Sequence, residues 1–254
     1  MKKLALAVFL LLPLPAVAQE PGITITYPDG VPQIQIDETQ TACPSDGLTG
    51  RTRQKIVDAA AAEWSLFRFP RFAITAVKHY DVIPPGISPN EKRTRADAGF
   101  LPRVVPVGYM EDDKEVRKRI GDYWASVRFR DVFVIQNQIW RYTDGRAGWG
   151  VYWSGAFVSF VMCKAGLGND EFVRSGTHVA YIRPAVAQRD GARSGYAYTA
   201  YDLAEVVPAP GDLLCAARDD EDKVIDNLAA FRSNPHSGYH CDIVVGFNVA
   251  DPKK

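Results

Sequence analysis

The chain has 254 residues, of which 46% are hydrophobic, and its 30 Lys and Arg balance its 30 Asp and Glu to a formal net charge of +0. This composition is typical of a globular protein with a real core. The balanced charge argues weakly against nucleic acid as a partner, because concentrated positive charge drives that binding.

The N-terminus has the pattern of an export signal. Lys2 and Lys3 form a short basic region, residues 4–17 are mostly apolar, and Ala16-Val17-Ala18 matches a cleavage site. The apolar run is shorter than the about 20 residues of a spanning helix, and no cysteine follows it that could carry a lipid anchor. We therefore expect residues 1–18 to be a signal peptide cleaved near Ala18, and a periplasmic or secreted protein that is not membrane-anchored.

The next segments predict an extended arm, one helix and a long loop. Residues 19–47 are rich in Pro, Gly, Thr and Asp, and the alternating segment 22–27 predicts one edge strand. The prolines and charges of residues 69–106 predict a loop. Between them lies a helix over about 51–67, whose helical spacing places four side chains on its buried face: Ile56, Ala60, Trp64 and Phe67.

A second helix is predicted over 113–128, and residues 132–135 fit either a strand or a buried helical turn. A third helix should begin near Ser154 and end before Gly166. Another should start near Thr177 and kink or restart at a proline. The second helix is expected to turn four side chains inward: Val116, Ile120, Tyr123 and Val127.

The C-terminal part predicts a strand over 213–217, a helix near 223–231 and a last strand over 241–247. Two motifs here and upstream point to chemistry. A loop and apolar helix over 149–161 present Ser154 at the helix start, and the last strand begins with His240-Cys241-Asp242-Ile243-Val244-Val245.

Together with Pro210-Gly211-Asp212-Leu213-Leu214, these motifs resemble the nucleophile helix and core strands of CHAP-type and related papain-like cell-wall amidases and endopeptidases. The chain more narrowly resembles a secreted bacterial family catalogued only as a domain of unknown function. This resemblance rests on the dipeptide Trp153-Ser154, on His178-x-x-Tyr181-Ile182 and on the final His-Cys-Asp-Ile-Val. The resemblance covers about residues 149–247.

The resemblance implies an α+β fold, in which a papain-like domain over 106–254 packs a helix on a small antiparallel sheet. Residues 19–105 would be an N-terminal arm and helical extension. Of the four cysteines, which allow three pairings in an oxidising compartment, it favours Cys215 with Cys241, because it makes their two strands neighbours.

The resemblance also implies hydrolysis of an amide in peptidoglycan or a cell-wall peptide, with Ser154 in the place of the nucleophilic cysteine and His240 as general base. A serine hydroxyl is too weak an acid to ionise at a helix start, so it must lose its proton to a histidine during attack.

Asp242 is the nearest candidate to orient His240, although Cβ atoms two residues apart on a strand are about 6–7 Å apart, which is long for a direct hydrogen bond. Asp202 and Asp212 are the alternatives. His178, in the first turn of its helix, is a further candidate catalytic residue.

Trp149, Tyr152 and Trp153 form either a lip that contacts substrate or ordinary aromatic packing around the helix start. Arg218 is a candidate ligand for a substrate carboxylate, with a surface ion pair to the neighbouring aspartates as the simpler interpretation.

No cofactor or metal is expected. His178, His240 and Asp242 form a conceivable metal set, but no HExxH or comparable spacing supports it. Two other functions stay open: a non-catalytic module that binds a cell-wall peptide or a protein and keeps Ser154 as a relic, and a secreted effector that cuts the walls of rival cells.

Overall fold

The computed structural model describes residues 22–36, 43, 45–68, 109, 111, 113–127, 129–217, 227–233 and 238–246, together with the backbone of 71–77 and 101–107. These residues form helices and three two-stranded antiparallel sheets. The predicted α+β class is therefore confirmed. The predicted signal peptide lies outside the described residues.

The N-terminal arm is a hairpin. Strands β1 (Ile23–Thr26) and β2 (Gln33–Ile36) pair antiparallel around a short 3₁₀ turn, η1 (Pro28–Gly30). The amide of Ile23 donates a 2.9 Å hydrogen bond to the buried carboxylate of Asp122, which holds β1 against a helix about a hundred residues away in the sequence. The predicted strand at 22–27 is confirmed.

The first helix, α1 (Thr52–Leu66), matches its prediction, but its buried face differs. Ile56, Ala60 and Phe67 are buried as expected, whereas Trp64 is 47% exposed. Glu63, which the apolar pattern leaves out, is 1% exposed instead. The prediction that Trp64 belongs to the core was wrong. Glu63 takes the buried position because it pairs with Arg119, and the apolar pattern of one helix cannot reveal a partner on another.

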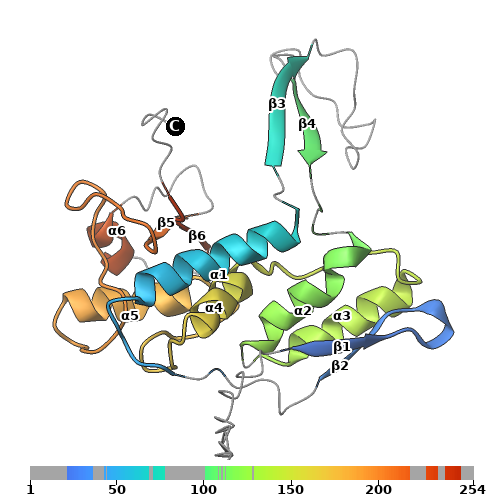
Figure 1. Cartoon of the computed structure of the whole chain (residues 1–254), viewed down its shortest axis with the longest axis horizontal. Coiled ribbons are helices and arrows are strands. Elements are labelled where there is room, and N and C mark those ends of the chain that lie inside the picture. Colours follow the sequence, from blue (N-terminus) through green and yellow to red (C-terminus); the bar gives the residue numbers. More distant parts are fainter. Residues whose placement is uncertain are drawn as a thin grey trace, which may run out of the picture.

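A β-hairpin stands where a loop was predicted. Strands β3 (Arg71–Val77) and β4 (Leu101–Val107) pair antiparallel from Arg71↔Val107 to Val77↔Leu101. In Figure 1 they project away from the helices. The prediction was wrong because the prolines and charges between these strands dominate the composition of the whole segment.

The next helices are 3₁₀ turn η4 (Lys114–Val116), α2 (Arg117–Ala125) and α3 (Asp131–Tyr142). The segment 132–135 is thus helical, which settles the choice that its sequence left open. All four side chains predicted to point inward from the second helix are buried: Val116, Ile120, Tyr123 and Val127.

Helix α4 (Ser154–Lys164) lies at the centre of the molecule and contacts α1, α2 and strand β6 (Tyr239–Ile243). It is apolar on nearly all sides, as expected for a helix surrounded by other elements. Gly166, at φ +84, follows its end in a left-handed conformation, as predicted.

The C-terminal elements are α5 (Val179–Arg189), β5 (Leu213–Ala217), α6 (Leu228–Ser233) and β6. Helix α5 continues through Pro184 as one element. Strand β5 agrees with its prediction, whereas β6 begins two residues earlier and ends at Ile243. The two strands pair antiparallel, with Cys215 opposite Cys241.

Two disulfides connect these parts. Cys215–Cys241 joins β5 to β6, as predicted, and Cys43–Cys163 ties the N-terminal arm to the end of α4 across 120 residues. Such bridges are compatible with an extracytoplasmic protein. None of the helices in the described ranges has the length and apolarity to cross a membrane.

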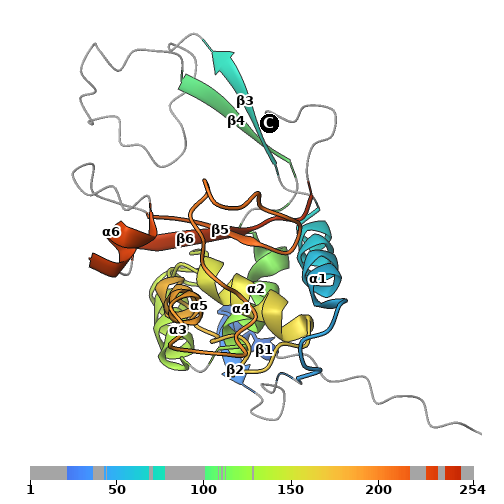
Figure 2. The same ribbon diagram turned by 90° about the vertical axis from the view of Figure 1, so that its left-hand side faces the viewer.

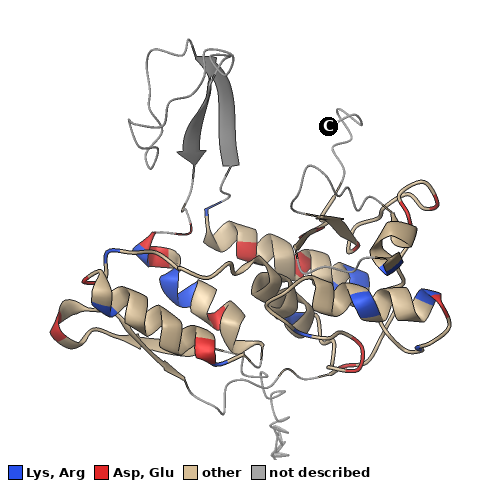
Figure 3. Ribbon diagram, turned by 180° about the vertical axis from the view of Figure 1, so that it is seen from behind, with Lys and Arg blue, Asp and Glu red and all other residues tan. Residues whose placement is uncertain are grey.

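Two large apolar clusters meet at α4. Figures 1 and 2 show this helix between α1, α2 and α5. One gathers aromatic side chains of α2, α3 and the loop before α4, and the other joins α1 to α4, α5 and β6. Acidic and basic residues are interspersed along the described elements (Figure 3). The extension therefore shares its core with the C-terminal part of the chain.

Candidate functional site

Ser154 is the first residue of α4, and its hydroxyl oxygen lies 2.9 Å from Nε2 of His178. His178 is the residue just before α5 and is only 5% exposed. The two side chains come from separate helices, 24 residues apart in the sequence. Their contact is the centre of the candidate site.

Close backbone approach makes this contact possible. A Cβ at Gly155 would lie 2.3 Å from the carbonyl oxygen of Gly176, so only glycine lets the start of α4 touch the loop before His178. The buried Ser159 hydroxyl fastens the same loop: it donates to the carbonyl of Ser175 at 2.8 Å and accepts its amide at 2.9 Å. The Ser154–His178 pair is thus held by backbone packing.

Strand register determines which nitrogen of His178 carries the proton. Cys215 and Cys241 face each other with Cα atoms 4.0 Å apart, as in a non-hydrogen-bonded pair. The amide of Cys241 therefore points away from β5, and it donates to Nδ1 of His178 at 3.2 Å. Because an amide can only donate, Nδ1 is the acceptor, and the neutral ring carries its proton on Nε2. His178 then donates to the Ser154 oxygen.

Tyr181 adds a second donor at the same nitrogen. Its hydroxyl hydrogen-bonds Nδ1 of His178. Burial raises the pKa of Tyr181, and the charges of nearby tyrosines and of Asp242 add to the effect. The phenol therefore keeps its proton and can donate a hydrogen bond to the ring.

His240 and Asp242 lie beside this pair on the exposed face of β6. Nε2 of His240 is 3.2 Å from the Oδ1 of Asp242, and the rings of His178 and His240 are 4.9 Å apart, edge to face. The long Cβ separation expected along a strand does not prevent this bond, because both side chains lean toward each other. A carboxylate partner at Nε2 favours the tautomer with its basic lone pair on Nδ1.

The two alternative aspartates bind elsewhere. Asp212 accepts Nη1 of Arg53 and the amide of Ala209, both at 2.7 Å. Asp202 accepts the amide of Leu228 at 2.7 Å. Within the described parts of the chain, these two carboxylates bind groups other than a histidine, whereas Asp242 contacts His240.

The three aromatic residues before α4 have different environments. Trp149 is buried edge to face on Trp140 and donates to the carbonyl of Arg117, so the packing interpretation applies to it. Trp153 is half-buried and donates to Glu111 at 2.8 Å. Tyr152 is 85% exposed and is the one that can form a lip. Arg218 lies outside the described residues.

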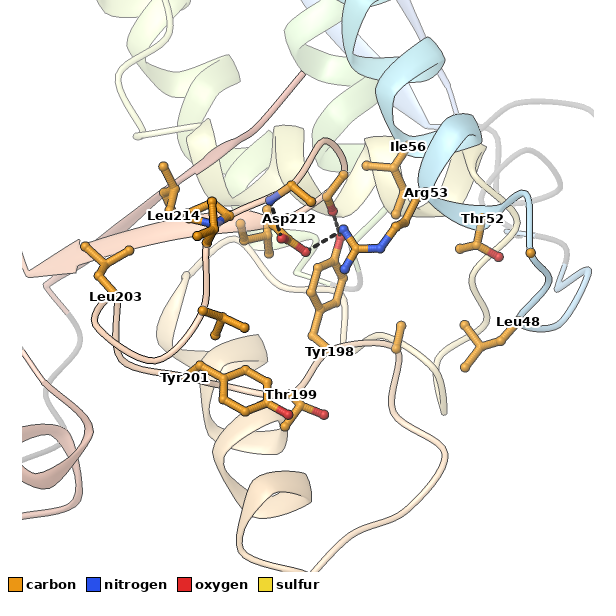
Figure 4. Close-up of a pocket in the computed structure, with 18 of the residues that line it drawn as sticks. Leu48, Thr52, Arg53, Ile56, Tyr198, Thr199, Tyr201, Leu203, Asp212 and Leu214 are labelled. Atoms are coloured by element: carbon orange, nitrogen blue, oxygen red, sulfur yellow. Dashed lines mark hydrogen bonds and ion pairs between the residues drawn. The ribbon is translucent and has the colours of Figure 1, made fainter. Parts of the chain in front are cut away.

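Sequence reasoning missed a separate cavity lined by Arg53, Tyr198 and Tyr201 (Figure 4). The spacing of these residues matches no motif, and an arginine in a first helical turn is usually a solvated charge. The tyrosines at 196, 198 and 201 were the available signal. Among the described residues, no three His, Cys, Asp or Glu side chains gather so as to hold a metal ion.

Comparison with known proteins places the chain in a family. The model of a family described as "Uncharacterized protein conserved in bacteria (DUF2272)" matches residues 111–254. No curated protein and no solved structure matches the chain. The expected membership in a bacterial family of unknown function is confirmed, while the wider resemblance to papain-like amidases stays a prediction.

Proposed function

We propose that this chain, which belongs to the uncharacterised bacterial family DUF2272, hydrolyses an amide bond of cell-wall peptides with Ser154 as the nucleophile. The observation that carries the proposal is the 2.9 Å contact between Ser154 and His178 at the start of a buried helix, beside the His240–Asp242 pair. The substrate class comes from the resemblance of these motifs to papain-like cell-wall amidases. The disulfides and the predicted leader support action outside the cytoplasm.

The two histidines have different roles in this proposal. His178 donates through Nε2 and therefore positions the Ser154 oxygen instead of taking its proton. His240, oriented by Asp242, supplies the basic nitrogen that accepts the proton as Ser154 attacks the carbonyl carbon. The imidazolium that forms is stabilised by the Asp242 carboxylate.

The start of α4 supplies the remaining element. The first amides of a helix have no partner within the helix and form its positive end. The backbone N–H groups near Ser154 and Gly155 would therefore stabilise the oxyanion that develops on the substrate.

The test is digestion of purified sacculi by the mature protein, with released fragments identified by mass. Wild type and the exposed-serine control Ser65→Ala should release the same fragments, and Ser154→Ala should release none. His240→Gln should lower the rate by about 10²–10⁴, as loss of a general base does. Release that persists in Ser154→Ala, or no release by the folded protein, contradicts the proposal.

A second experiment separates the two histidines. In His178→Gln the amide can still donate to Ser154 and accept the amide of Cys241, so we expect a milder loss of rate than in His240→Gln. Equal, complete losses in the two variants would make His178 the base and contradict the assignment of roles.

One observation favours a second candidate function, a non-catalytic module that binds cell-wall peptides. The hydroxyl of Tyr181 and the amide of Cys241 both donate to Nδ1 of His178, which makes Ser154 a hydrogen-bond acceptor in the resting site. A serine that has lost its catalytic role would accept the hydrogen bond from His178 equally well. Co-sedimentation with sacculi without fragment release, together with new thiol-dependent release by Ser154→Cys, would establish this function instead.

A further inference from the structure

A cavity of about 680 Å³ opens between the start of α1, residues 197–209 and the turn into β5 (Figure 4). Cavities of this size hold a drug-sized molecule or a short peptide. Neither Ser154 nor either histidine of the site lines it. Most of its wall is apolar: Leu48, Ile56, Leu203, Val206, Val207 and Leu214.

The cavity lies toward the opposite end of α4 from Ser154. The hydroxyl oxygen of Tyr198, on its wall, lies 3.4 Å from the sulfur of Met162. Met162 follows Ser154 by eight residues, which is about 12 Å along a helix. The cavity is therefore a second location, distinct from the Ser154–His178 contact, and Leu214 in its lining is the strand partner of Asp242.

Hydrogen bonds within the chain hold the floor of the cavity in place. The buried Tyr198 hydroxyl donates to the carbonyl of Gly211 at 2.9 Å, and Asp212 accepts the amide of Ala209 at 2.7 Å. Gly211 has φ +90, and a Cβ there would meet the backbone of Arg53 at 3.2 Å. Close packing of α1 on this turn thus fixes the position from which Arg53 extends.

Arg53 offers an anchor for a carboxylate. Its side chain is 61% exposed, and its described partners, Asp212 and the carbonyl of Pro210, both bind Nη1. A guanidinium has five N–H donors in a planar fork. Nε and Nη2 can therefore bind a ligand carboxylate in two parallel hydrogen bonds.

Asp202 supplies the opposite charge. It lies between Tyr201 and Leu203, which Figure 4 shows on the other wall from Arg53. Its described side-chain contact uses Oδ1 alone. Because Asp212 already balances Arg53, the remaining charge in the lining is the carboxylate of Asp202, which attracts a cation.

We infer that this cavity binds a short peptide with free ends, whose carboxylate pairs with Arg53 and whose ammonium group lies toward Asp202. Its apolar side chains cover the wall formed by Leu203 and Val207. The charged groups of the mostly apolar lining are Arg53 with its partner Asp212 and, on the other wall, Asp202. This arrangement matches a ligand with one end of each charge and disfavours a uniformly charged one. The inference does not depend on Ser154 or on hydrolysis.

Calorimetric titration with trileucine tests this inference. Trileucine with free ends should bind with a dissociation constant below about 1 mM, and either C-terminal amidation or N-terminal acetylation should weaken it at least about tenfold. Ser154→Ala should bind trileucine as wild type does. No binding of trileucine up to about 1 mM, or equal affinity for all three peptides, overturns the inference.

Matched variants assign the two charges. Arg53→Gln should weaken trileucine at least about tenfold and leave the amidated peptide unaffected, whereas the neighbouring, non-lining Arg51→Gln should change nothing. Asp202→Asn should weaken trileucine but leave the acetylated peptide unaffected, with the exposed Asp58→Asn as control. Variants that fold, by circular dichroism, and bind all three peptides as wild type does would overturn the assignment.

Discussion

Two buried polar clusters flank α4, and they differ in how their hydrogen-bonding groups are matched. In the first, Glu63 is 1% exposed and binds Arg119 through both carboxylate oxygens, and Tyr123 donates to it at 2.9 Å. In the second, the buried ring of His178 has donors at one nitrogen and Ser154 at the other.

The difference separates a structural cluster from a reactive one. Burial alone would lower the pKa of Arg119, but the hydrogen bond and charge of Glu63 raise it above its ordinary value. Acid and base in that cluster thus satisfy each other. Ser154 is only half-buried, and the ring of His178 that contacts it lies edge to face against His240, which has its own carboxylate partner in Asp242. Complete pairing stabilises a fold, whereas a group left partly exposed to substrate can do chemistry.

Removing the acid from the first cluster should have the largest effect on stability. Glu63→Gln leaves the mostly buried Arg119 without its counter-charge, so we expect a loss of about 3–5 kcal/mol in the free energy of unfolding. Urea titration measures it, with the exposed Asp58→Asn as a control that costs less than about 0.5 kcal/mol. A loss below about 1 kcal/mol would show that the cluster is not structural.

Removing the disulfide between β5 and β6 tests how the second cluster is held. Replacing Cys215 and Cys241 by serine should cost about 2–4 kcal/mol, because the bridge restricts the unfolded chain. It should also lower activity per folded molecule, since β6 carries His240 and the amide that orients His178.

The other disulfide is the matched comparison. Replacing Cys43 and Cys163 by serine should also lower stability, but the activity of the molecules that stay folded should be retained. Unfolding curves and assays at a temperature where both variants are folded separate the two effects. Equal specific activities would contradict a special role for β6.

Two serines on α4 have different surroundings, and their removal should have different effects. Ser159 satisfies an amide and a carbonyl of the loop before His178, so Ser159→Ala should cost about 1–3 kcal/mol by leaving buried groups unpaired. Ser154→Ala loses one half-buried hydrogen bond and should cost about 1 kcal/mol or less, yet it should abolish hydrolysis. A Ser154→Ala variant as unstable as Ser159→Ala would mark Ser154 as structural.

The smallest effect concerns an exposed ion pair. The hydrogen bond to Arg189 lowers the pKa of Glu205 to about 2. Since the folded pKa is depressed, the stabilisation is present above the ordinary glutamate value of about 4.3 and is lost as the pH falls toward 2. The melting temperature of wild type should exceed that of Glu205→Gln near neutral pH, and the difference should shrink below about pH 4. A constant difference would show that the pair carries no pH-dependent stability.

The helices α1, α2, α4 and α5 could be predicted because their apolar spacing records burial locally, whereas the spacing of 132–135 in α3 left strand and helix open. The inward face of α2 and the start of α4 at Ser154 follow from that pattern. Glu63 is buried and Trp64 is exposed, the reverse of what their polarity predicts. The partner of Glu63 is 56 residues away in the sequence, where no local pattern can reveal it. The hairpin β3–β4 escaped prediction because the segment between its strands has the composition of a loop.

The residues of the candidate site could be predicted from the sequence, but the hydrogen bonds between them could not. Ser154, His178, His240 and Asp242 all follow from the motifs, and the structure brings them together. That Ser154 contacts His178 depends on the close approach of Gly155 to the carbonyl of Gly176, in a segment about 20 residues further along the chain. The tautomer of His178 depends on the register of β5 and β6, which is fixed only once the strands pair.

The most direct test of the central claim is the reaction of Ser154 with a fluorophosphonate probe, followed by peptide mass spectrometry. We expect one phosphonyl adduct on the peptide that contains Ser154, formed as the serine oxygen displaces fluoride. The adduct should be absent in Ser154→Ala and strongly reduced in His240→Gln. A folded wild-type protein without an adduct on Ser154, or with an equal adduct in His240→Gln, would contradict an activated nucleophile at this site.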